Sequence, residues 1–282
     1  MRHNDFTPTK KQTRLGFFIL GMFYSASSFS NAEPMPSPPT SNTLTSTQIE
    51  LPIQGASLEY KRDVRLLQVL EEANSLGSQG YFPLAAQLFN ASKADLIEKK
   101  KNDVLRVLDT YAFENREAKL VKKQLASFNY QYRVFINLDK NVVLSQTDKN
   151  PLLVSHFSND KAIKNTPSSE RFSLYLTARP THIQMVGVMQ ESAKLTLIEH
   201  GGINDYIDAL PNGKLGHSVD KSFAYAIQPD GTVQDISYAY WNEQPTYLAP
   251  GAIVFMPFES LPSQYSTLNQ DIVELLRHKV NL

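Results

Sequence analysis

The chain has 282 residues, no cysteine, and equal numbers of basic and acidic side chains, 28 of each. Without cysteine it forms no disulfide and carries no lipid-modified cysteine of the lipoprotein type. A formal net charge of zero argues against binding to the phosphate backbone of nucleic acids, which requires a basic face. We therefore expect no nucleic-acid partner.

The N-terminal segment has the pattern of a secretory signal peptide. Lys10, Lys11 and Arg14 precede an uncharged apolar run at 15–24, and small residues end the segment at Ala32. The run has about ten residues, whereas a membrane-spanning helix needs about 20. We expect cleavage after Ala32 and export to the periplasm, which leaves 24 basic and 27 acidic side chains.

The first ordered elements are expected near residue 49. Residues 33–49 are rich in Pro, Ser and Thr and cannot bury enough apolar surface to order themselves, which predicts a flexible leader. A strand is predicted at 57–60. A helix then begins at Asp63, whose side chain can cap its first amides, and ends at Gly77 and Gly80.

Residues 83–128 are predicted to be helical throughout, with a break at Glu114. Apolar side chains recur at helical spacing in two stripes, Ile97, Val104, Leu105 and Leu108, then Ala118, Val121 and Leu125. Three lysines at 99–101 are expected on solvated faces. A polyanion-binding patch is the less favoured alternative, because three adjacent residues of a helix point in different directions.

The pattern then changes to the alternation of strands. Strands are predicted at 130–138, 171–177, 183–189, 222–228, 232–237 and 252–258. A short helix is expected at 204–210, capped by Asn204. The turn Pro229-Asp230-Gly231 predicts a hairpin, because proline and glycine favour its two corners. Short strands with few helices among them indicate an α+β fold.

The chain ends with an amphipathic helix predicted at 266–280, which Ser266 or Thr267 can cap. Its 15 residues span about 22 Å, less than the hydrocarbon core of about 30 Å, so we expect that it does not cross a membrane. It should pack on the protein itself or bind the helix of a partner. Its apolar face consists of Leu268, Ile272, Leu275 and Leu276.

Several segments resemble the GfcC family of capsule-biosynthesis proteins: 178–188, the hairpin at 225–233, Trp241-Asn242, 248–252 and 268–276. The resemblance implies two β-grasp domains, the first with an inserted helical bundle, and a C-terminal amphipathic helix. It also implies a periplasmic location beside capsule or exopolysaccharide export machinery. It implies no particular reaction.

The resemblance and the composition together divide the chain into five parts. These are the signal peptide at 1–32, the leader at 33–49, a β-grasp domain at 50–178 with its helical insertion at about 83–128, a second β-grasp domain at 179–260, and the helix at 261–282.

Two candidate ligand-binding positions emerge. Arg133 lies among apolar residues, and the resemblance implies that an arginine here lines a cleft, where it could hold an acidic sugar or phosphate. The alternative is an edge residue in a salt bridge. Trp241 and Asn242 lie near three tyrosines and could form a sugar-stacking platform, although such aromatic clusters more often fill a core.

Motifs of catalysis are scarce, and no catalytic residue is assigned. Residues 216–220 approach a nucleophile elbow, but Asp220 stands where the elbow needs glycine. Asp205 and Asp208 could act on a glycosidic bond, yet paired acids are common on helical surfaces. The six histidines show no metal-ligand spacing, so we expect neither metal nor cofactor.

The sequence therefore favours a non-catalytic periplasmic accessory protein that binds capsule polysaccharide, exopolysaccharide or the outer-membrane export machinery. Two alternatives remain open. One is an enzyme that trims or modifies the polymer, with Arg133 holding an acidic sugar. The other is an adaptor that binds its partner through the C-terminal helix.

Overall fold

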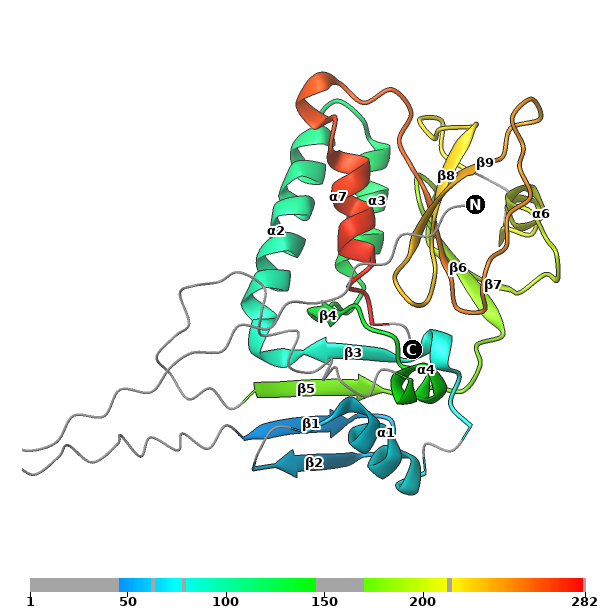
Figure 1. Cartoon of the computed structure of the whole chain (residues 1–282). Helices are drawn as coiled ribbons and strands as arrows, with labels where there is room; N and C mark the ends of the chain where they lie inside the picture. The colour runs from blue at the N-terminus through cyan, green and yellow to red at the C-terminus, as the bar shows by residue number, and fades with distance from the viewer. Residues whose placement is uncertain (1–45, 62–63, 78–79, 146–169, 212–214, 281–282) are drawn as a thin grey trace, which may run out of the picture. The chain divides into compact units, whose positions relative to one another are not determined.

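The structure is a computed structural model, and it describes residues 46–61, 64–77, 80–145, 170–211 and 215–280 (Figure 1). The expected signal peptide, most of the leader and the Asp63 cap lie outside these residues. The last leader residues do not fit the expectation of flexibility, because Thr47–Ile49 already belong to the first strand.

Two five-stranded mixed sheets share one topology. The first contains β1 (Thr47–Leu51), β2 (Ala56–Tyr60), β3 (Gln87–Asn90), β4 (Arg133–Val134) and β5 (Glu170–Tyr175), in the order β2-β1-β5-β3-β4. The second contains β6 (His182–Gly187), β7 (Ala193–Thr196), β8 (Phe223–Ile227), β9 (Val233–Ser237) and β10 (Ile253–Met256), in the order β7-β6-β10-β8-β9. In each sheet the first and last strands are parallel neighbours at the centre. This is the β-grasp arrangement, and the predicted α+β fold with two β-grasp domains is confirmed.

The first sheet is covered on one face by two helices, α1 (Leu66–Ser75) and α4 (Lys140–Leu144) (Figure 1). Apolar side chains of α1 and α4 join those of the sheet in one buried cluster, which includes Leu70, Val143 and Phe172. Because only one stripe of α1 is apolar, this helix lies flat on the sheet with its charged side outward.

The helical insertion lies between β3 and β4 and consists of α2 (Ala94–Tyr111) and α3 (Glu117–Ala126). Both run beside the C-terminal helix α7 (Leu268–Leu276) (Figure 1). The two predicted apolar stripes are buried, except that Leu105 is half-buried. They enter the same core cluster as the second sheet, so the insertion of the first domain supplies part of the core of the second.

Gln124 of α3 fastens this insertion to strand β6. Its buried side-chain amide accepts from the N–H of Gly187 and donates to the Gly187 carbonyl, both over 3.0 Å, and it donates to Met189 over 2.9 Å. Gly187 has a φ of +120°, and a Cβ there would lie 2.2 Å from the carbonyl oxygen of Met256. Only glycine fits this position, because it has no side chain. The backbones of β6 and β10 can therefore approach each other at the residue that bonds to Gln124.

The segment that follows α7 lies against the first domain. The N–H of Val280 donates to Asn129 over 3.0 Å, and the N–H of Gln131 donates to His278 over 3.1 Å. The Val280 side chain packs against Phe89 and Tyr175 of the first sheet. The segment up to Val280 therefore contacts the first domain, while α7 packs in the core of the second.

The sequence prediction missed three strands and made a fourth too long. Residues 83–128 are not helical throughout, because Gln87–Asn90 forms β3, whose four residues are all buried. Four residues are too few to show a period, and tertiary pairing with β5 and β4 decides the structure. The predicted strand at 130–138 shortens to Arg133–Val134, and β1 and β7 were not predicted.

Helix ends also differ from the predictions. Helix α1 begins after Arg65, and α6 (Ile203–Asp208) begins after Gly202, whose N–H donates to Asp205, so Asn204 is not the cap. Helix α7 has nine residues instead of 15, and no capping hydrogen bond from Thr267 is present. Across the described ranges, no helix combines the length and apolar character that crossing a membrane requires.

Candidate functional site

A cleft of about 630 Å³ opens between α2, α7 and the residues around β4. We call it the β4 cleft. Its apolar lining comes from Leu96, Ile97, Val104, Val107, Phe135 and Leu268. Its polar lining comes from Lys99, Lys100, Asp103, Tyr132, Arg133, Asp271, Glu274 and His278. Its volume falls in the range of small-molecule sites, and it has the usual mixture of an apolar wall and a few polar groups.

Arg133 lines this cleft with its side chain only 4% exposed. The Nη2 group donates to the carbonyl oxygen of Pro229, and the guanidinium lies 5.6 Å from the centre of the Phe135 ring. Burial lowers the pKa of Arg133 to about 10, against which Asp230 raises it. The group therefore stays charged at neutral pH.

The β8–β9 turn, Pro229 to Gly231, contacts Arg133 and Phe135 of the cleft lining. Arg277 of the C-terminal segment donates from Nε to Gly231 over 2.9 Å and lies 4.3 Å from the Phe135 ring centre. Gly231 has a φ of +90°, and a Cβ there would lie 2.5 Å from Phe135 Cε1. Two arginines and one phenylalanine thus hold the turn of the second domain against the first.

His278 stands behind Arg133. The backbone N–H of Arg133 donates to Nδ1 of His278 over 3.0 Å. Burial, and next the charge of Lys100, lower the pKa of His278 to about 4, so the ring is neutral at pH 7. Because Nδ1 accepts a hydrogen bond, the ring hydrogen resides on Nε2, which makes Nε2 a donor at the cleft.

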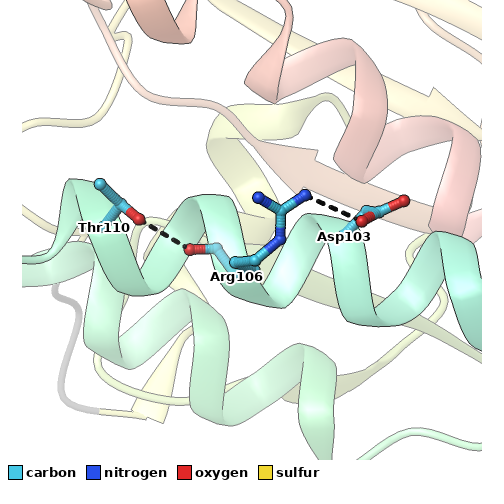
Figure 2. Close-up of polar contacts among 3 residues, drawn as sticks. All are labelled: Asp103, Arg106 and Thr110. Carbon is cyan, nitrogen blue, oxygen red and sulfur yellow. Dashed lines mark hydrogen bonds and ion pairs between the residues drawn. The ribbon is translucent and has the colours of Figure 1, made fainter.

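Each of the three carboxylates that line the cleft has an ion-pair or hydrogen-bond partner. Figure 2 shows Asp103 beside Arg106 one turn further along α2, with an ion pair of 2.9 Å, and Thr110 donating to the Arg106 carbonyl over 3.1 Å. Asp271 accepts from the hydroxyl of Thr267 over 2.9 Å. Glu274 forms an ion pair with Arg277.

The lysines of the cleft differ from its acids. Within the part of the chain that the structure describes, neither Lys99 nor Lys100 forms an ion pair. Lys99 is exposed as predicted, whereas Lys100 is half-buried. Two of the three carboxylates are paired with Arg106 and Arg277, whereas Asp271 accepts only from a neutral hydroxyl and keeps its charge. Lys99, Lys100 and Arg133 contribute three positive charges to the lining, and the charge of Asp230 acts on Arg133 from nearby.

The aromatic cluster around Trp241 is placed differently from the prediction of a core. Tyr238 is buried, but Trp241 is 77% exposed, Tyr240 98% and Tyr247 75%. The amide of Asn242 donates to Ser222 over 3.4 Å, and its Oδ1 is buried without a hydrogen bond among the described residues. None of these residues lines the β4 cleft, so the structure does not bring Trp241 and Arg133 into one site.

The apolar face of α7 lies inside the molecule. The face packs against α2 and the second sheet, and its four residues, Leu268, Ile272, Leu275 and Leu276, are at most 1% exposed. In this structure a partner could reach only the remaining side of the helix.

The near matches to catalytic motifs have structural explanations. The Glu117 carboxylate accepts from the N–H groups of His217 and Ser218, each over 2.7 Å, and from the Ser218 hydroxyl, so 216–218 is a docking loop for α3. The Asp205 carboxylate accepts a hydrogen bond from the N–H of Gly202 at the N-terminus of α6. The described residues contain no cluster of three or more His, Asp or Glu side chains that could hold a metal ion.

Comparison with known proteins identifies relatives of both halves of the chain. Residues 43–158 match the family described as capsule biosynthesis GfcC, N-terminal, and residues 191–281 match capsule biosynthesis GfcC C-terminal. The uncharacterized protein YjbG of Escherichia coli (strain K12) is 23% identical over 174 residues, which cover 61% of this chain and 64% of that protein. The match thus spans less than two thirds of that relative's length. The two domain matches and the paired β-grasp sheets establish that this chain belongs to the GfcC family of capsule biosynthesis.

Proposed function

We propose that this protein is a periplasmic, non-catalytic accessory protein of capsule or exopolysaccharide assembly that binds an acidic stretch of the polymer in the β4 cleft. The observation that carries the proposal is the charge state of this cleft. Two of its three carboxylates form ion pairs with Arg106 and Arg277, while Lys99, Lys100 and Arg133 form no ion pair among the described residues and can attract an anion.

The geometry of the cleft suits a sugar acid. The planar guanidinium of Arg133 can form hydrogen bonds with a carboxylate, although its Nη2 group already donates to the Pro229 carbonyl. Nε2 of His278 can donate a hydrogen bond to a sugar hydroxyl. The exposed part of Phe135 offers an aromatic face for the apolar side of a sugar ring. Membership of a capsule-biosynthesis family makes capsule polysaccharide the first ligand to test.

The decisive experiment is calorimetric titration with oligosaccharides from the capsule of the host organism. The same oligosaccharides with their carboxyl groups reduced to alcohols serve as the ligand control. We expect Lys100→Ala to weaken binding of the native oligosaccharides at least tenfold and the reduced ones to bind weakly or not at all. Lys123→Ala removes an exposed lysine of α3 that does not line the cleft, and it should change nothing.

Arg133→Lys supplies a second test that preserves the charge. Lysine lacks the planar fork, so binding should weaken even though the cleft stays positive. Circular dichroism must show an intact fold, because Arg133 also holds the β8–β9 turn. Equal affinity for native and carboxyl-reduced oligosaccharides, or full binding by Lys100→Ala, would sink the acidic-polymer proposal and direct attention to the export machinery.

Localisation is tested separately. We expect the protein in the periplasmic fraction of its host, with an N-terminus at Glu33 after cleavage behind Ala32. Edman sequencing of the purified protein reads this directly, and an intact N-terminal segment would contradict the proposal.

Exposed aromatic residues favour a second surface for the same function. Trp241, Tyr240 and Tyr247 lie within eight residues of the chain and are all at least 75% exposed. Exposed aromatic rings stack on sugars, and a long polymer can contact this loop and the cleft as separate sites. Trp241→Ala tests the loop without changing the cleft. It should weaken the binding of long polymer chains more than the binding of short oligosaccharides.

A further inference from the structure

A second cavity, of about 400 Å³, lies beside the β4 cleft. We call it the Asp139 cavity. Phe135 lines both cavities and is 41% exposed. The apolar part of the Asp139 cavity includes Leu84, Ile136 and Leu138. Its polar groups come from Asn137, Asp139, Asp230, Thr232 and Arg277.

The segment after β4 supplies two of these polar groups. The N–H of Asp139 donates to Oδ1 of Asn137, and the N–H of Asn141 donates to Oδ1 of Asp139, each over 2.8 Å. The first bond closes a turn and the second caps helix α4. Each side chain uses one polar atom in this way. The Nδ2 group of Asn137 and the Oδ2 atom of Asp139 form no hydrogen bond among the described residues.

The β8–β9 turn supplies two further groups. The N–H of Thr232 donates to Oδ1 of Asp230 over 2.8 Å. The second carboxylate oxygen of Asp230 and the hydroxyl of Thr232 form no hydrogen bond within the described part of the chain, and both residues are exposed. The cavity therefore presents hydrogen-bond donors and acceptors from both domains.

The charge of the Asp139 cavity differs from that of the β4 cleft. Neither Asp139 nor Asp230 forms an ion pair in the described ranges. Arg277, the basic residue of the lining, pairs with Glu274. Two carboxylates without an ion pair repel an anion, but they accept hydrogen bonds from hydroxyl groups, and hydrogen bonds to a charged acceptor are strong. This cavity therefore suits an uncharged group rich in hydroxyls.

Phe135 is the side chain at which the two cavities meet. The centre of its ring lies 4.3 Å from the guanidinium of Arg277 and 5.6 Å from that of Arg133. These contacts hold the ring in place. A fixed aromatic ring that is exposed to both cavities can contact the apolar sides of two consecutive sugar units.

We propose that the Asp139 cavity is a second sugar subsite, which binds an uncharged sugar unit next to the acidic unit held in the β4 cleft. The carboxylates of Asp139 and Asp230 accept from the hydroxyls of this sugar, and the amide of Asn137 donates to it. Leu84 and Ile136 contact its apolar side. The inference rests on the proposed function, and it adds that the ligand contains an acidic sugar linked to a neutral one.

The test compares two ligands by NMR titration of the protein. One is the sugar acid released by complete hydrolysis of the host capsule, and the other is a single repeating unit of the same capsule. The amide signal of Arg133 reports on the β4 cleft, and that of Asn141, which donates to Asp139, reports on the Asp139 cavity. We expect the free acid to shift the Arg133 signal alone and the repeating unit to shift both signals.

The two signals separate a failure of this inference from a failure of the proposed function. A repeating unit that shifts the Arg133 signal and leaves the Asn141 signal unmoved overturns the second subsite and leaves the acidic site standing. A free acid that also shifts the Asn141 signal overturns the inference too, because an anion then occupies the Asp139 cavity. If neither ligand shifts the Arg133 signal, the proposed function fails and this inference fails with it.

Asp139→Asn supplies the matched variant, because asparagine caps helices as well as aspartate does while removing the charge. We expect it to weaken binding of the repeating unit about fivefold, since a neutral acceptor forms the weaker hydrogen bond. Binding of the free acid should not weaken. Glu59→Gln removes an exposed carboxylate outside both cavities and should change neither affinity. Without a second subsite, loss of the negative charge of Asp139 would leave binding of the acidic repeating unit unchanged or strengthen it, and either result contradicts the inference.

Discussion

The backbone N–H of Arg133 donates to Nδ1 of His278 over 3.0 Å, across 145 positions of the sequence. This bond requires the neutral form of the ring, because a protonated imidazole has no acceptor. Together with the bond from Arg133 to Pro229, it joins β4, the C-terminal segment and the β8–β9 turn at one point. The shape of the β4 cleft thus depends on the protonation state of one histidine.

Stability should decline through His278 as the pH falls from about 6.5 to about 4. Its pKa is about 4 in the folded protein and about 6.5 when unfolded, so the unfolded chain binds more protons between these values. A shift of this size corresponds to about 3 kcal/mol at most. Urea unfolding at pH 7, 5.5 and 4 measures the loss.

His278→Asn should flatten this dependence, because the Asn carbonyl oxygen can accept from Arg133 and does not titrate. Carboxylates titrate in both proteins, so only the difference between them reports on His278. His200→Asn, at an exposed position whose positive φ asparagine tolerates, is the control and should behave as wild type. Identical pH profiles for wild type and His278→Asn would refute the role of this histidine.

Replacing Gln124 by Ala should destabilise the protein by about 2–4 kcal/mol. The substitution leaves the N–H and carbonyl of Gly187 and the carbonyl of Met189 without their buried partner. Denaturant unfolding gives the value, and Lys123→Ala on the exposed side of the same helix should change it by less than about 0.5 kcal/mol. A loss that small for Gln124→Ala would mean that water replaces all three bonds.

Helix α7 should prove indispensable for folding. Leu275 is fully buried, and Leu275→Ala should cost about 2–5 kcal/mol, whereas Gln270→Ala on the exposed side should cost almost nothing. Thermal unfolding compares the two. Deletion of the helix therefore cannot test the adaptor hypothesis, which calls for substitutions on the exposed side; a stable, cooperative Leu275→Ala variant would reopen the question.

Trp241 is the single tryptophan, so fluorescence reports on the aromatic loop alone. At 77% exposure its emission should resemble that of a solvated indole and be quenched efficiently by acrylamide in the native state. Short acidic oligosaccharides bound in the β4 cleft should leave the quenching unchanged. Long polymer chains that stack on the loop should reduce it, and protection by short oligosaccharides would place their site at the loop instead.

Local patterns predicted the local structure well. The stripes from Ile97 to Leu108 and from Ala118 to Leu125 identified α2 and α3, and Pro229-Asp230-Gly231 identified the β8–β9 turn. Strand β3 was not predicted, because four residues are too few to show a hydrophobic period. Its extended conformation results from pairing with β5 and β4. The β-grasp topology itself came only from the family resemblance, since strand order depends on pairings that periodicity does not encode.

The candidate site was harder to predict. Arg133 was singled out by its charge among apolar neighbours, but Pro229 lies 96 residues away and His278 145, so no local pattern could link them. That Lys99 and Lys100 both line the cleft depends on where α7 packs against α2. Trp241 was expected in the core on general grounds, and its exposure follows from the path of an irregular segment that sequence rules do not describe.

The shared core of the insertion, α7 and the second sheet constrains the order in which this chain can fold. Residues of α2 and α3 are synthesised first, yet the packing of their apolar stripes is complete only when the second sheet and residues 268–276 are available. Central contacts thus span most of the sequence, a high contact order that slows folding. A partly synthesised chain exposes these stripes, and such intermediates are prone to aggregate. We therefore expect the chain to reach its folded state only after its last residues have been synthesised. Truncation near the C-terminus should lower the yield of folded protein at lengths that still leave ligand binding unchanged.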